Sequence, residues 1–268
     1  MVQLSNPQDL CPGFNDTRRS DTEILKEITE ELSAIKILGF KLRGIIWLHR
    51  ITDNRMTGSD IRNLDIFKKL VGEGAFSNVV LATTMWGKVT DMSEAVARDR
   101  ELREEFWSDM SAKGSTTTRF DGSEASAQGI VSQLLGRKAV VLKVQEELVH
   151  QNFSLNQTLA GAFLEPRVET EEADFRRRLE ELEYLLKFER DNNARLKAKR
   201  SQKRNSEALK QRMADKEILN SKPGKEIESK LEAWKQRGHT KALQSIQALA
   251  AVCSITFGIV GFVLGGHF

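Results

Sequence analysis

The first half of the chain alternates between two spacings of apolar residues, one typical of helices and one of buried strands. Ser20-Asp21-Thr22-Glu23 forms a capping box, and apolar residues recur every three or four positions from Ile24 to Ile35 behind it. This pattern predicts an amphipathic helix that ends before Gly39. The apolar run 44–48 and the run 78–82 are short, which is typical of strands buried on both faces.

The same alternation continues toward residue 137. Apolar spacing predicts further helices over 61–70 and 102–110 and after Ser123, and a third strand over 116–120. Strands that alternate with helices predict an α/β fold with a doubly wound parallel sheet. In such sheets ligands bind at the carboxyl ends of the strands. Any ligand-binding or catalytic residues are therefore expected in the loops after Leu48, Ala82 and Phe120.

His49 and Arg50 end the first predicted strand at this edge, and Asp53 follows in the loop. Their polar groups have two interpretations: they contact a ligand, or they cap the strand and hold the turn that follows. No serine, histidine and aspartate have the sequence context of a hydrolase triad. The sequence therefore identifies no catalytic residue.

Residues 138–241 have the pattern of a charged helical stalk. Phe175, Leu179, Leu182 and Leu186 are spaced four, three and four residues apart, which predicts a weak coiled coil of about three heptads. Glu165-Pro166 and the segment 221–224 predict breaks. Helix 172–200 is accordingly a candidate for self-association.

Residues 242–268 carry no Lys, Arg, Asp or Glu. The stretch 242–266 is long enough to span a bilayer as a helix, and Gly261 and Gly265 have the spacing of a close helix–helix contact. Basic residues precede it, which predicts a tail-anchored protein on the cytoplasmic side of a membrane. The alternative is a helix that docks on the α/β region of a cytoplasmic protein.

Composition narrows the class of protein further. The 268 residues have a formal net charge of +3, distributed as −2 over 1–164 and +5 over 165–241. Two distant cysteines exclude a disulfide-stapled scaffold, and no His/Cys spacing indicates a metal site. The block 195–204 has six basic and no acidic residues but lacks aromatic side chains for base stacking. The lack of aromatic residues argues against nucleic-acid binding by this block. The block is then either a solvent-exposed face of a helix or a surface that is attracted to anionic lipid.

Several segments together resemble one family. Cys11–Arg18, with Ser20–Leu25 behind it, resembles the switch II region of P-loop GTPases, particularly G domains of the immunity-associated (avirulence-induced) type known from fungi and plants. Gly44–Met56 and Val79–Trp86 resemble the next two strands with their loops, and Ser123–Ala127 lies where the family has its last guanine-contacting loop. The resemblance covers roughly residues 10–135.

The resemblance implies a G domain that binds GTP with Mg²⁺ and hydrolyses it. It implies nucleotide contacts at four small residues, which are Gly13, Thr84, Ser126 and Ala127. It identifies no metal ligand among the residues that are present.

Three features of this family are not found in the sequence: the P-loop, the switch II aspartate and the guanine-selecting aspartate. Gly87-Lys88 and Gly224-Lys225 lack the upstream glycine and the following hydroxyl residue of a P-loop. Leu10 stands where the switch II aspartate is expected, and Gly87 where the guanine-selecting aspartate is expected. We therefore expect an N-terminally truncated G domain over 1–137, without its first strand and P-loop, and impaired nucleotide binding.

Two functions remain open from the sequence. One is a GTPase-like protein in which GTP binding is impaired, with the α/β region on a helical stalk. The other is a non-enzymatic, membrane-anchored coiled-coil scaffold. Domain boundaries are predicted at 137/138 and 241/242.

Overall fold

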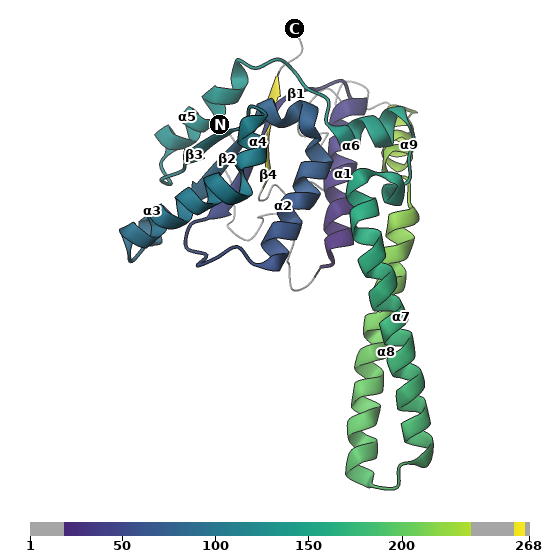
Figure 1. Ribbon diagram of the computed structural model, residues 1–268. Helices are drawn as coiled ribbons and strands as arrows, with labels where there is room; N and C mark the ends of the chain where they lie inside the picture. The colour runs from purple at the N-terminus through teal and green to yellow at the C-terminus, as the bar shows by residue number, and fades with distance from the viewer. Residues whose placement is uncertain (1–18, 237–259, 266–268) are drawn as a thin grey trace.

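The computed structural model describes residues 19–236 and 260–265 of the chain. It consists of an α/β base and two long helices that project from the base as an arm (Figure 1). The elements of the base are α1 (Asp21–Ile37), β1 (Lys41–Arg50), α2 (Gly58–Val71), β2 (Val79–Thr84), α3 (Met92–Glu101), α4 (Ser108–Ala112), β3 (Thr116–Arg119), α5 (Glu124–Leu135) and α6 (Lys143–Gln145).

The sheet has the strand order β3-β2-β1-β4. β1 is parallel to β2, with Ile45 opposite Val79, and β2 is parallel to β3, with Val80 opposite Thr116. The prediction of an α/β fold with a small parallel sheet is confirmed. Because the three parallel strands share one direction, Arg50, Thr84 and Arg119 end at the same edge.

The other neighbour of β1 is β4 (Val260–Gly265), which pairs with it in the antiparallel direction. The apolar tail was expected to be helical over 242–266, but these six residues, Gly261 and Gly265 included, form a strand. The remainder of the predicted membrane segment lies outside the described residues. Within the described part of the chain, no helix is both long and apolar enough to cross a bilayer.

Alternate residues of the strands are buried under different helices. Ile45 and Trp47 of β1 pack in the larger core with α1 and α2, which cover one face of the sheet. Val80 and Ala82 of β2 pack with α5 on the other face, where Leu134 is fully buried. Gly44 is required in β1, because a Cβ there would lie 2.7 Å from the backbone oxygen of Asn78 and 2.5 Å from the Leu134 side chain. The sheet is thus covered on both faces, as the sequence predicts.

Helix capping at the start of the base follows the sequence closely. Ser20 Oγ accepts a hydrogen bond from the Glu23 amide, and the Glu23 carboxylate accepts one from the Ser20 amide. This reciprocal capping satisfies two amides at the helix start. The helix begins at Asp21 and ends at Ile37, two residues before Gly39, which has a φ of 79°.

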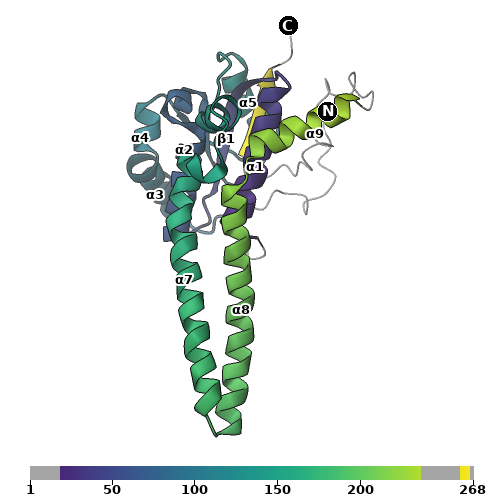
Figure 2. The ribbon, with the colours of Figure 1, turned by 90° about the vertical axis from the view of Figure 1, so that its right-hand side faces the viewer.

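The stalk is an antiparallel helical hairpin. α7 (Leu159–Phe188) and α8 (Asn192–Asn220) lie side by side along their lengths, and α9 (Pro223–Gln236) returns against α1 (Figure 2). The predicted break at Glu165-Pro166 is wrong, because α7 continues through Pro166. The chain turns instead at 189–191, while the second predicted break, at 221–224, is confirmed between α8 and α9.

Candidate functional sites at the sheet edge and on the helical arm

The carboxyl end of β1 forms one side of a small cleft. His49 is largely buried beside Trp107, with their rings 6.4 Å apart and nearly perpendicular. Burial lowers the pKa of His49, although Asp53 and Asp60 oppose the shift. The imidazole is therefore neutral at physiological pH, which suits a packed ring better than a proton carrier.

Polar side chains around this cleft are held by local contacts. Arg50 Nε donates to Asp53 Oδ2 at 3.2 Å, and Arg98 Nε donates to the Ile51 carbonyl at 3.0 Å. The cavity volume of the cleft is about 10 Å³, which is room for roughly one water molecule and far below the usual range for small-molecule sites. These contacts favour the interpretation that His49 and Arg50 cap the strand and hold the turn.

A second group of polar residues closes the edge between β2, β3 and α3. Asp99 is buried and accepts hydrogen bonds from Thr83 Oγ1 at 3.0 Å, Arg103 Nε at 3.1 Å and Arg119 Nη2 at 2.9 Å. Trp86 donates its indole N–H to Thr83 Oγ1 at 3.0 Å, and the Arg119 guanidinium stacks 4.2 Å from the centre of its ring. Two arginines neutralise one carboxylate, so this network stabilises the edge rather than leaving a reactive group.

Three of the four residues predicted to contact a nucleotide are in the described part of the chain. Thr84 ends β2, where its hydroxyl donates to the His49 carbonyl at 3.3 Å. Ser126 and Ala127 lie in the first turn of α5, and the Ser126 amide donates to Ser123 Oγ at 3.1 Å. Gly13 lies outside the described residues.

The structure brings the loops after β2 and β3 to the same edge. The Phe120 amide donates to the Thr83 carbonyl at 2.8 Å, so the loop 120–123 starts directly beside Thr84. Among the described residues, no hydrogen bond joins Thr84 to Ser126 or Ala127. Nor does any group of three or more His, Cys, Asp or Glu in the described ranges have an arrangement that could hold a metal ion.

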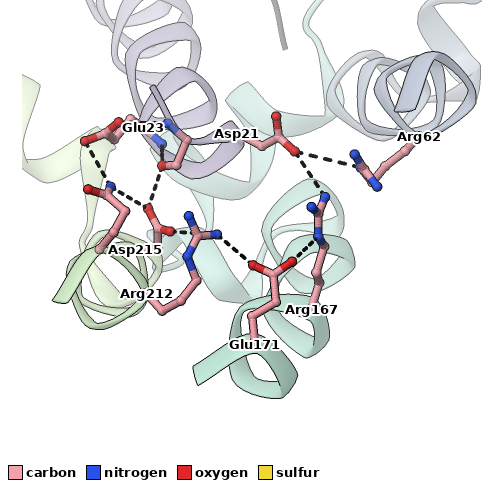
Figure 3. A network of polar contacts seen from close by, with 9 residues as sticks. Asp21, Glu23, Arg62, Arg167, Glu171, Arg212 and Asp215 are labelled. Atoms are coloured by element: carbon pink, nitrogen blue, oxygen red, sulfur yellow. Dashed lines mark hydrogen bonds and ion pairs between the residues drawn. The ribbon is translucent and has the colours of Figure 1, made fainter. Parts of the chain in front are cut away.

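We define the root of the arm as the start of α7 and the end of α8, where both helices meet α1. It contains an ionic network that was not predicted from the sequence (Figure 3). Asp215 of α8 is fully buried and accepts a hydrogen bond from Ser20 Oγ at 2.5 Å. Ser20 is also the N-cap of α1, so one hydroxyl contacts both the helix start and the arm. Burial raises the pKa of Asp215, while Ser20 and Arg212 oppose the shift.

The network continues from Asp215 to both helices of the arm and to α2. Arg212 lies 3.1 Å from Asp215 Oδ2 and 3.1 Å from Glu171 Oε2, and Glu171 accepts from Arg167 Nε at 2.7 Å. Asp21 lies 3.6 Å from Arg167 and 3.8 Å from Arg62. Arginines and carboxylates alternate, which joins α7, α8 and α2 to the first turn of α1.

One sequence signal points to this network. Asp215 lies seven residues after Ala208 and four before the buried Leu219, so all three share one face of α8. We call this face of α8 the seam. A carboxylate at such a position has to be paired when it is buried. Its partner Ser20 is 195 residues away, and no local pattern identifies it.

Neither a family model nor a curated protein matches this chain.

Proposed function

We propose that this protein is a non-enzymatic interaction protein in which the α/β base holds a helical arm for partner binding. The observation that carries the proposal is the arm itself, two antiparallel helices of 30 and 29 residues that stand out from the base (Figure 2). At 1.5 Å per residue each helix is about 45 Å long. An arm of this length presents a surface far from the sheet edge.

The contents of the sheet edge support the same proposal. The Asp99 carboxylate is neutralised by two arginines, the pKa of His49 is lowered, and the cleft beside it is small. Thr83 Oγ1 lies 3.0 Å from the Asp99 carboxylate, but both side chains are buried, so this hydroxyl is closed to a substrate and does not supply the accessible nucleophile that covalent catalysis needs.

Binding and hydrolysis of GTP test the proposal. We expect a fluorescent GTP analogue with Mg²⁺ to show no saturable binding up to roughly millimolar concentration, since no Gly-x-x-x-x-Gly-Lys-[Ser/Thr] sequence is present to wrap phosphates. Saturable micromolar binding together with phosphate release would overturn a non-enzymatic function.

A specific observation favours GTP binding as the second candidate. The loops after β2 and β3 lie side by side at the carboxyl edge, and the family resemblance assigns guanine contacts to Thr84, Ser126 and Ala127 in these loops. Impaired GTP binding by a degenerate G domain is therefore the alternative function.

Gly87→Asp distinguishes the two candidates. The change introduces the carboxylate that the resemblance expects, and a Cβ at Gly87 meets no atom within 4 Å. If the loop is a guanine site, the variant should bind GTP at least several-fold more tightly than the wild type and leave ATP binding unchanged. Gly74→Asp, another position where a Cβ meets open space, is the matched control. Equal affinities for all three proteins would exclude the guanine site.

A further inference from the structure

The end of the arm has an unusual surface. We define the arm tip as residues 184–204, which comprise the end of α7, the turn and the start of α8. Four large apolar side chains are exposed there: Tyr184 at 70%, Leu185 at 43%, Phe188 at 60% and Leu196 at 50%. The rings of Tyr184 and Phe188 lie 4.8 Å apart, so they form one aromatic face rather than two isolated side chains.

The arm tip is also strongly basic, with eight Lys and Arg against two acidic residues. Both acidic residues are engaged in the turn, since Asp191 caps α8 through the Ala194 amide and Glu189 accepts from the Asp191 amide. Among the described residues, the only ion pair made by a basic residue of the arm tip joins Lys203 to Glu207, at 4.0 Å. A net charge of +6 is therefore left facing solvent.

We propose that the arm tip docks on an anionic lipid surface, an inference that rests on the arm being the binding element of the proposed function. Aromatic side chains favour the interface between lipid headgroups and acyl chains. Lys and Arg beside them are attracted to acidic headgroups, by about 1 kcal/mol for each residue near the surface. The arm tip combines both features at the far end of the arm.

Other occupants fit the surface less well. A second copy docked tip to tip would bring together two surfaces of charge +6. A nucleic acid would use the basic residues and the two rings, but the exposed Leu185 and Leu196 have no role in base stacking. Acyl chains and acidic headgroups account for both the aliphatic and the basic side chains.

The arm also provides the reach that docking requires. Met213, on the same helix as Leu196, lies about 30 Å from the start of α8 toward the base and is 50% exposed. A membrane touched by the arm tip would therefore leave Met213 in water. This separation makes Met213 a control position on the same arm.

Vesicle co-sedimentation of the full chain tests the charge contribution. We expect binding to phosphatidylcholine vesicles with about 30 mol% phosphatidylserine, weak binding to phosphatidylcholine alone, and release by salt. Arg195→Gln/Lys199→Gln should weaken partitioning about thirtyfold, because two surface charges are lost. Lys210→Gln/Lys222→Gln removes the same charge from exposed positions outside the arm tip and should leave binding within about twofold.

A fluorescence measurement tests which part of the chain enters the lipid, since other apolar segments could also bind vesicles. Phe188→Trp should be quenched by lipids brominated in the acyl chains, whereas Met213→Trp should not exceed the wild-type background from the four native tryptophans. Equal quenching at both positions would overturn the proposal, as would equal binding by the two double-charge variants.

Two further outcomes identify a different partner. Retention of a single-stranded oligonucleotide without vesicle binding would assign the arm tip to nucleic acid. A dimer that Phe188→Ser abolishes, again without vesicle binding, would assign it to a second copy. Either result overturns the lipid proposal and leaves the interaction function intact, whereas GTP hydrolysis overturns that function whatever the vesicles show.

Discussion

The base and the arm are stabilised in different ways. In the base, alternate strand residues such as Val79 and Val80 are fully buried under helices on opposite faces. In the arm, Leu179, Leu182 and Leu186 of α7 are only half-buried, although α7 packs against α8. Burial of apolar surface therefore stabilises the base far more than the outer arm.

The root of the arm depends on a third kind of interaction. Ion pairs join Asp215, Arg212 and Glu171 there (Figure 3). Leu164 of α7 and Leu219 of α8 are also buried. The arm is thus most stable where it meets the base and least stable at its tip. The surface of the arm tip contributes little to folding and is therefore available for binding a partner.

The same substitution in the two regions should have very different effects. Leu81→Ala removes a fully buried side chain from the middle of the sheet, and we expect a loss of about 3–4 kcal/mol in the free energy of unfolding. Leu196→Ala, in the exposed part of the arm, should change it by less than about 0.5 kcal/mol. Urea unfolding followed by circular dichroism measures both. Similar losses would contradict the difference in burial.

The pH dependence of stability should reveal a buried carboxyl group in the base. Glu31 of α1 is 5% exposed, and burial raises its pKa from 4.5 to about 8, with Glu27 and Glu30 adding to the shift. The lysines of this interface are paired elsewhere, Lys26 with Glu226 and Lys230 with Glu30. At a pH between 4.5 and about 8, the folded protein therefore keeps a proton on Glu31 that the unfolded chain has released.

The sign of the effect follows from proton binding. Between pH 4.5 and about 8 the folded state holds more protons, so the stability due to Glu31 is complete below pH 4.5 and falls as the pH rises to about 8. The loss is at most about 5 kcal/mol across this window, at about 1.4 kcal/mol for each pH unit. Glu31→Gln should flatten the profile and stabilise the protein at pH 8, as measured by urea unfolding at several pH values. An unchanged slope in the variant would show that Glu31 does not titrate in this range.

Most of the base could be predicted from the sequence. The capping box and the spacing behind it locate α1, and the apolar runs locate β1 and β2, because local pattern and tertiary burial agree there. The helix expected over 102–110 is less regular: a π-helical turn at Leu102–Phe106 precedes α4, although Leu102 and Met110 are buried as expected.

The arm and its root were harder to predict. Pro166 removes one hydrogen bond from α7, but Leu164 and Val168 on either side are buried, so tertiary packing holds the helix through it. The ionic network depends on contacts such as Ser20 with Asp215, 195 residues apart. Local spacing carries no information on such pairs.

Removing the buried carboxylate should loosen the root of the arm. Asp215→Ala leaves Arg212 and the Ser20 hydroxyl without this partner, and we expect a loss of about 2 kcal/mol with faster amide exchange at the root. Asp215→Asn keeps an oxygen for Ser20 and should lose less. Asp174→Ala, which breaks an exposed pair with Arg177 at 2.9 Å, should cost less than about 0.5 kcal/mol. An equal loss in Asp215→Ala and Asp174→Ala would exclude a structural role for the network.

The smallest expected effect concerns the seam of the outer arm. Ser201 is half-buried at a seam position three residues after Ala198 and seven before Ala208. Ser201→Leu adds an apolar side chain at this half-buried position and should stabilise the arm by about 0.5–1 kcal/mol. Hydrogen exchange should slow between 175 and 205 and remain unchanged in the sheet. Lys203→Leu, on the exposed face two residues away, is the control and should not slow exchange. Equal protection by both variants would mean that helix propensity, rather than the seam, limits the stability of the outer arm.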